Sequence, residues 1–129
     1  MTADDVVTKM YAAMSFAAGG EPDWQAQSEV FAPRARLVRM RDDAVFEFDP
    51  ESFRQDYERM IRSGEIESLY EHELSRDTKV WGNIAHVLST YELRSAADGE
   101  FISRAIKSIQ LFERDGRWWI SAMIWRRVV

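Results

Sequence analysis

The 129-residue sequence contains no cysteine, which excludes disulfide bonds, thiolate nucleophiles and cysteine-ligated metal sites. It also has only three prolines and shows no low-complexity segment, internal repeat or linker-like change of composition. We therefore expect one domain spanning residues 1–129, a size at which a chain can bury a sizeable core.

Long apolar runs and an excess of positive charge are missing as well. No apolar stretch approaches the roughly 20 residues of a membrane-spanning helix. The opening residues, MTADDVVTKM, are acidic where a secretory signal would be basic. The net charge of −5 disfavours nucleic acid and anionic membranes as partners. Together these observations predict a cytoplasmic protein.

Helical periodicity marks the first part of the chain. Thr2 is a candidate N-cap, apolar residues recur at intervals of four from Val6 to Met14, and Gly19-Gly20 is the expected end of this helix. A second, short helix is expected to begin after Asp23. Both would present an apolar face to a core.

A third helix and several strands follow. Asp49-Pro50 provides a capping carboxylate and then a proline at the first helical position, and Gly64 is a suitable stop. Alternating residues predict two short strands on either side of Asp42-Asp43 and four long strands after the third helix. The approximate spans of the six strands are 34–40, 44–48, 66–80, 84–94, 102–113 and 117–127.

This order of elements implies an α+β protein. Segregated helices and a run of consecutive antiparallel strands favour a curved, mostly antiparallel sheet with about three helices on its concave face. Strands of about 11 residues would be about 35 Å long and must twist.

Residues 108–125, SIQLFERDGRWWISAMIW, predict a hairpin around Asp115-Gly116. A two-residue turn fixes which side chains share a face. A three-residue loop with a glycine bulge would shift the pairing by one, but the two-residue register separates residue types more cleanly. One face then suits packing beneath helices and collects Lys107, Ile109, Leu111, Trp118, Ile120, Ala122 and Ile124.

The opposite face of the hairpin mixes large aromatic and small polar side chains, as the cores of interfaces often do. We expect it to meet a second copy of the chain in a homodimer, since exposed tryptophans would form an adhesive patch. The alternative is that loops or the N-terminal segment cover this face within the monomer. The expected dimer-interface residues are Ser108, Gln110, Phe112, Trp119, Ser121, Met123 and Trp125.

The stretches WGNIAHVLSTYELR and RAIKSIQLFERDGRWWI, together with the order of elements, resemble the nuclear transport factor 2-like superfamily, in its SnoaL-like and ketosteroid-isomerase-like branch. The resemblance covers essentially the whole chain. It implies a cone-shaped, cystatin-like roll with a pocket between helices and concave sheet, and frequent dimers through the convex sheet. Members include isomerases, cyclases, hydrolases and non-catalytic binding domains, so the fold alone does not assign a function.

Glu71 and Glu73 alternate to one face of a strand and are candidates for a general acid or base if that face is concave. Tyr91 is a candidate hydrogen-bond donor to a ligand. A solvated strand edge for the carboxylates and a core position for the tyrosine are the competing interpretations. The residues expected to line the pocket are Tyr11, Trp24, Tyr57, Glu73, Ser89, Tyr91 and Arg126.

Other chemistry is disfavoured. Strand parity places His72 and Asp77 on opposite faces, which argues against an acid–base dyad, and His72 and His86 lack metal-ligand spacing. No metal and no cofactor are expected. The same parity sends Arg104 outward and Arg126 inward, unless a bulge reverses either of them.

These observations predict a homodimeric domain that binds a small ligand. An alternative is an acid–base enzyme acting on a small apolar metabolite, with Glu71 or Glu73 as base and Tyr91 as donor. A structural module whose cone is filled by its own side chains is a third possibility.

Overall fold

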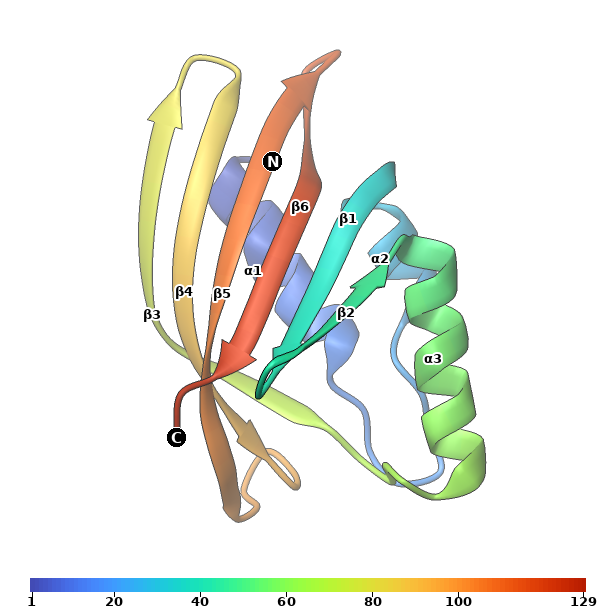
Figure 1. The fold of residues 1–129 in the computed structure, drawn as a ribbon. Helices are drawn as coiled ribbons and strands as arrows, with labels where there is room; N and C mark the ends of the chain where they lie inside the picture. Colours follow the sequence, from blue (N-terminus) through green and yellow to red (C-terminus); the bar gives the residue numbers. More distant parts are fainter.

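The computed structural model describes residues 1–129 and contains three helices and one six-stranded sheet. Figure 1 shows α1 crossing one face of the curved sheet while α3 lies beside β1 and β2. None of the helices has both the length and the apolar character needed to cross a membrane. The elements are α1 (Ala3–Met14), α2 (Trp24–Ser28), β1 (Phe31–Arg41), β2 (Ala44–Phe48), α3 (Pro50–Ser63), β3 (Tyr70–Trp81), β4 (Ile84–Arg94), β5 (Phe101–Arg114) and β6 (Arg117–Arg127).

The strand order is β2-β1-β6-β5-β4-β3. The consecutive antiparallel pairing of β3 to β6 confirms the predicted meander, and the order of helices and strands confirms the α+β class. The single parallel pair joins β1 to β6. As a result, the last strand of the chain lies in the interior of the sheet rather than at its edge.

Local capping chemistry explains where the helices begin. Thr2 and Asp49 each accept a hydrogen bond from a backbone amide of the first turn, and each forms the reciprocal bond of a capping box. Gly64 ends α3 in the left-handed conformation, at φ 82°, which costs glycine little. These three predicted boundaries are confirmed.

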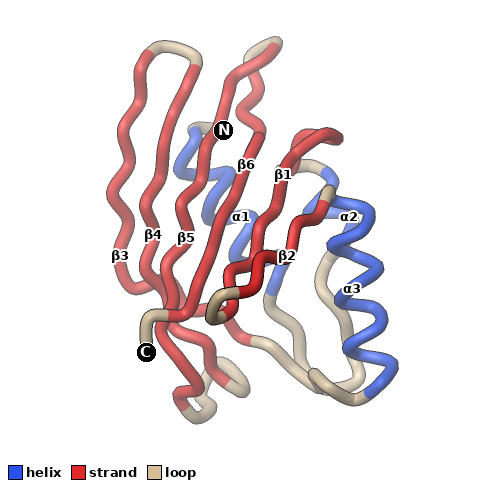
Figure 2. Tube along the Cα trace, in the orientation of Figure 1, coloured by secondary structure: helices blue, strands red, loops and turns tan.

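Two other predicted boundaries were wrong, for one shared reason. α1 ends at Met14 rather than at Gly19-Gly20, and β3 begins at Tyr70 rather than at residue 66. The backbone of Phe16 forms a two-way bridge with Leu69, with N···O distances of 2.8 and 2.9 Å. This tertiary pairing takes the chain out of the helix early. Figure 2 draws most of the adjoining stretches, after α1 and before β3, as loop.

A β-bulge at Ser121 makes the predicted pairing of the hairpin wrong in the half that lies beyond the bulge. Pairing follows the two-residue turn as far as Leu111 opposite Ile120, but Gln110 then lies opposite Ala122, so Ser121 is the extra residue. Beyond the bulge the two faces of β6 are exchanged. Residues before it keep the predicted placement, with Trp118 buried and Trp119 on the convex side.

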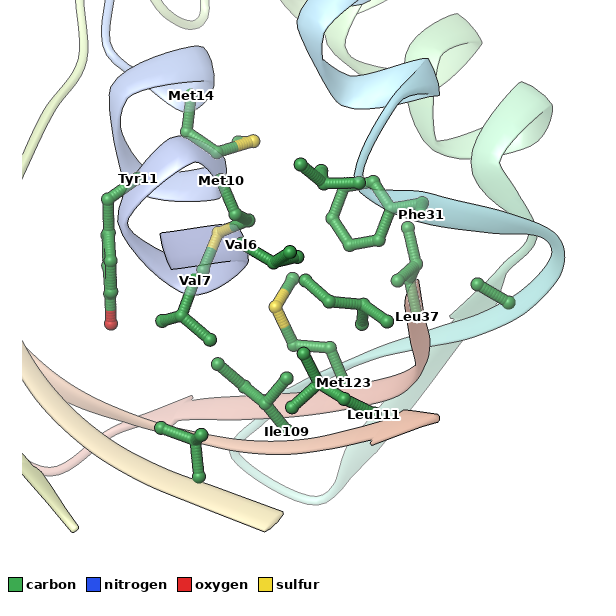
Figure 3. Close-up of a cluster of buried hydrophobic side chains, with 14 of the residues drawn as sticks. Val6, Val7, Met10, Tyr11, Met14, Phe31, Leu37, Ile109, Leu111 and Met123 are labelled. Carbon is green, nitrogen blue, oxygen red and sulfur yellow. The ribbon is translucent and has the colours of Figure 1, made fainter. Parts of the chain in front are cut away.

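The exchange moves Met123 and Trp125 from the convex to the concave face, so their assignment to an outward interface was wrong. Met123 is 1% exposed and belongs to the core, while Ile124, predicted to face the helices, is 47% exposed. Ala122 and Arg126 move outward with Ile124, so the predicted inward placement of Arg126 was wrong. Figure 3 shows Met123 directed toward Met10 of α1.

A second bulge, at Leu74, exchanges the two faces of β3 for the residues that follow it. Glu73 lies opposite Tyr91, whereas Ser75 lies opposite the next residue of β4, Thr90. His72 and Asp77 consequently share the convex face instead of lying on opposite faces. Neither can take part in chemistry on the concave side of the sheet.

The core lies between α1 and the concave face. Val7 and Met10 of α1 point toward Ile109 and Leu111 of β5 in Figure 3, and all four side chains are almost fully buried. Full burial of such a side chain contributes about 1.5–3 kcal/mol. This packing fixes α1 against one half of the concave face and leaves the other half to α3.

Candidate functional site

A cavity of about 400 Å³ opens where α3 and the segment after it meet the ends of four strands. Such a volume lies within the usual range of small-molecule sites. Eight of the 14 lining residues have aliphatic or aromatic side chains, the Glu71 carboxylate lies among them, and several arginines and Asp42 are at the rim. The lining residues are Arg39, Met40, Arg41, Asp42, Tyr57, Met60, Ile66, Leu69, Glu71, Tyr91, Leu93, Trp125, Arg126 and Arg127.

Alternation and helical spacing bring the walls together. Tyr57 and Met60 are three residues apart on α3 and share its inner side. Tyr91 and Leu93 are two apart on β4 and share the concave face. Trp125 joins them from β6 only because of the bulge at Ser121, so one inserted residue determines the composition of this wall.

Glu71 forms a buried ion pair with Lys107. Lys107 Nζ donates a hydrogen bond of 2.7 Å to Glu71 Oε1, and the two side chains are 2% and 5% exposed. Nζ also lies 4.3 Å from the ring centroid of Tyr11 and 4.5 Å from that of Tyr91. Glu71 lines the cavity, whereas Lys107 is enclosed behind it.

The charge state of this pair is set by opposing effects. Complete burial lowers the pKa of the Lys107 amine, while the carboxylates of Glu71 and Glu73 oppose that effect. Two aromatic faces add further stabilisation to the ammonium form. Lys107 is therefore the hydrogen-bonded partner that the chain itself supplies to Glu71 behind the cavity wall.

Two polar groups of the cavity have no protein partner. The hydrogen bond from Lys107 goes to Glu71 Oε1, which leaves Oε2 without a donor from the protein, and the Tyr91 hydroxyl makes no hydrogen bond to the protein. Burial, and then the negative charge of Glu71, raises the pKa of Tyr91 far above its usual value, so its hydroxyl remains a donor. The cavity thus offers one hydrogen-bond acceptor and one donor to a ligand.

Glu73 lies outside this cavity. Its carboxylate pairs with Arg76 at 2.6 Å and accepts a hydrogen bond of 2.5 Å from Ser89 Oγ, which itself is 2.6 Å from the Tyr11 hydroxyl. Arg76 also donates to the Asp4 backbone. This network fastens α1 to β3 and β4, and it leaves Glu73 no free oxygen to act on a ligand.

The predicted pocket residues therefore lie in three different places. Tyr57 and Tyr91 line the cavity, and Arg126 borders it from a convex-facing position at the end of β6. Tyr11, Glu73 and Ser89 form the adjacent network instead. Trp24 packs edge-on against Tyr57, with the Arg54 guanidinium over its ring, in the layer behind the cavity wall.

Lys107 is the main residue that the sequence-based assignment of the site missed. The alternation of the hairpin places it on the concave face, but only as the polar end of an aliphatic row. A signal was present, since a lysine between Ala105 and Ile109 on an inward-facing strand requires a buried counterion. The inward parity of Glu71 supplied the matching partner.

The rim of the cavity is rich in arginine. Arg39 lies against the Trp125 and Tyr57 rings and pairs with Asp56 at 3.1 Å. The remaining rim arginines, Arg41, Arg126 and Arg127, are exposed. No group of three histidine, aspartate or glutamate side chains in the chain could hold a metal ion.

No protein-family model matches the chain, and no curated protein matches its sequence. Solved structures do match. A protein of unknown function with a cystatin-like fold from Nostoc punctiforme has a TM-score of 0.74 at 12% identity, over 96% of this chain and 86% of that one. An NTF2-like protein of unknown function from Silicibacter pomeroyi has a TM-score of 0.66 at 18% identity, over 98% and 99% of the two chains.

An enzyme shares the fold as well. The hexachlorocyclohexane dehydrochlorinase LinA-type3 from Novosphingobium barchaimii has a TM-score of 0.71 at 10% identity, over 98% of this chain and 84% of that one. The chain therefore has a cystatin-like α+β fold. Within that class it has the NTF2-like architecture, as the sequence resemblance predicted.

Proposed function

We propose that the protein binds a small, largely apolar organic molecule in the cavity between α3 and the sheet. The observation that supports this most is the pair of unpartnered groups, Glu71 Oε2 and the Tyr91 hydroxyl, within an aromatic cavity of about 400 Å³. A cone filled by its own side chains would have no such cavity. Apolar walls would supply affinity, and the two polar groups would orient the ligand.

Native mass spectrometry of the purified protein tests this directly, because a bound molecule would appear as an added mass. Leu93→Trp should abolish that mass by filling the cavity. Leu88→Trp is the matched control, since Leu88 is on the same strand but faces the convex side and is 44% exposed. Equal ligand content in the two variants would contradict the proposal. So would the absence of any bound molecule from the parent protein and both variants.

The homodimer is part of the same proposal. Several large apolar side chains on the convex face are about half exposed, among them Ile84, Leu88 and Ile124, and Phe112 and Trp119 lie beside them. Association of two copies through this face would remove that surface from water. With Met123 and Trp125 turned inward, the expected interface retains Ser108, Gln110, Phe112, Trp119 and Ser121.

Sedimentation analysis tests the dimer. Leu88→Glu should give a monomer with an unchanged circular dichroism spectrum. Val45→Glu is the control, because Val45 is also exposed and apolar but lies on the edge strand β2. A parent protein that sediments as a monomer would contradict the assignment.

A second candidate function is acid–base catalysis, which is favoured by the free oxygen of Glu71 beside a counterion that supports its charge. Glu71 would remove a proton from carbon, and the Tyr91 hydroxyl would stabilise the oxyanion that forms next to it. The dehydrochlorinase with the same fold offers a precedent for an enzyme on this scaffold.

Deuterium exchange tests this candidate. The protein should speed the exchange of the carbon-bound protons beside the carbonyl of phenylbutanone in heavy water, as followed by NMR. Glu71→Gln should abolish the acceleration, while Glu73→Gln should retain it because Glu73 lies outside the cavity. Equal losses in both variants would contradict a specific role of Glu71.

A further inference from the structure

The charges that line the cavity are distributed unevenly from floor to rim. At the floor, the single carboxylate, Glu71, is matched by Lys107 at 2.7 Å. At the rim, Arg39 is matched by Asp56. The remaining charged lining residues are three arginines, Arg41, Arg126 and Arg127, and one aspartate, Asp42.

The three rim arginines take part in no ion pair with the protein. Arg41 lies at the end of β1, next to the turn to β2, and Arg126 and Arg127 lie at the end of β6. The parallel pairing of β1 with β6 places these strand ends beside each other, since Met40 lies opposite Arg126. Alternation turns Arg126 toward the convex face, opposite Ile106, whereas Arg41 and Arg127 have the concave parity. Two cations without an ion-pair partner therefore lie at one opening in a chain whose net charge is −5.

The charge of one rim arginine also affects a residue inside the cavity. The positive charge of Arg127 favours the ionised form of Tyr91 and so lowers the pKa of this residue against the larger effect of burial. Arg127 also lines the cavity from the concave side of β6, so it is close enough to act on a group inside the cavity. A guanidinium can bind a carboxylate through two parallel hydrogen bonds, which favours an acid group on a ligand at this position.

We propose that the ligand is an organic acid in its anionic form, with its carboxylate at Arg41 and Arg127 and its apolar body between Tyr57, Tyr91 and Trp125. This inference rests on the proposed function and names the class of molecule that fills the same cavity. The opposite orientation is disfavoured, because it would place the carboxylate against Glu71. A hydroxyl or amide hydrogen at the inner end of the molecule would suit Glu71 Oε2.

Three probes of matched shape test the charge requirement: the anion phenylbutyrate, the neutral phenylbutanamide and the cation phenylbutylamine. Isothermal titration calorimetry should give the tightest binding for phenylbutyrate, by about tenfold over the amide. Added salt should weaken binding of the anion and leave that of the amide nearly unchanged.

Arginine variants locate the site of the carboxylate. Arg127→Gln and Arg41→Gln should each weaken phenylbutyrate binding by about fivefold to tenfold and leave the amide within about twofold. Arg114→Gln is the matched control, because Arg114 is exposed at the hairpin at the far end of β5. Melting curves of each variant establish that the fold is retained.

The outcomes separate the two proposals. Equal binding of the anion and the amide, or preferential binding of the amine, would overturn the organic-acid inference and leave the ligand-binding function standing. The organic-acid inference would also be overturned if Arg114→Gln weakened binding of the anion as much as Arg127→Gln does. Absence of binding for all three probes, in a protein that carries no co-purified molecule, would count against the proposed function itself.

Discussion

Lys107 and Glu71 form the most deeply buried ion pair of the protein, with Nζ and Oε1 2.7 Å apart beneath the cavity. Removal of one member of such a pair leaves an uncompensated charge in an apolar environment, which costs about 3–5 kcal/mol. Lys107→Met should therefore lower the free energy of unfolding by about that amount, as measured by urea denaturation.

A double-mutant cycle isolates the interaction. The variant that combines Lys107→Met with Glu71→Leu should lose less stability than the sum of the two single variants, because no charge remains buried. The same cycle on the exposed Arg54–Glu58 pair of α3 should give a coupling of only about 0.3–0.5 kcal/mol. Additive losses at Lys107 and Glu71 would show that the buried pair is not coupled.

Alkaline pH should destabilise the protein through its buried tyrosines. Burial raises the pKa of Tyr11, Tyr57 and Tyr91 above the unfolded value of 10.0. Above that value the unfolded chain loses these protons while the folded protein keeps them, so stability falls as the pH rises. The ultraviolet absorbance of tyrosinate at about pH 11 should be clearly lower in the native protein than in urea. Identical titration curves would rule out the burial of these hydroxyls.

The bulge at Ser121 predicts opposite effects at two neighbouring positions. Met123→Glu places a carboxylate in the core and should cost several kcal/mol, or prevent folding. Ile124→Glu alters only the convex face and should leave the melting temperature nearly unchanged, although it should weaken self-association. If Ile124→Glu were the more destabilising of the two variants, the register without a bulge would be the correct one.

Arg76 should contribute to stability by holding α1 on the sheet. Its guanidinium binds Glu73, the Asp4 backbone and Thr8 Oγ1. Hydrogen bonds to charged groups contribute about 1.5–3 kcal/mol, so Arg76→Ala should lower the free energy of unfolding by about 2 kcal/mol. Exchange of the α1 amides with heavy water should accelerate more than exchange in α3. Uniform acceleration in both helices would contradict a local clamp.

Patterns that repeat over many residues could be read from the sequence. Helical spacing and capping residues such as Thr2 and Asp49 located all three helices, and alternation located the six strands. Hydrophobic periodicity is a property of a whole segment, so single irregular positions do not obscure it. For the same reason, the predicted α+β class agrees with the structure.

Features that depend on one residue or on distant contacts could not be read in this way. The bulges at Ser121 and Leu74 each reverse the faces of a strand, and neither position carries a glycine or another local signal. The early end of α1 depends on Phe16 meeting Leu69, more than 50 residues later in the chain. Trp125 was assigned to the outward face and missed as a cavity residue, because it reaches the cavity only through the Ser121 bulge.

The interior position of β6 has a consequence for biosynthesis. Until the ribosome has released residues 117–127, the β1–β2 ribbon and the β3–β5 ribbon have no strand to join them. Each then exposes a bare edge on which other nascent chains could add. Completion of the sheet is thus delayed until translation of this domain is almost finished, and a chain stalled before that point would be a substrate for chaperones rather than a smaller version of the same fold.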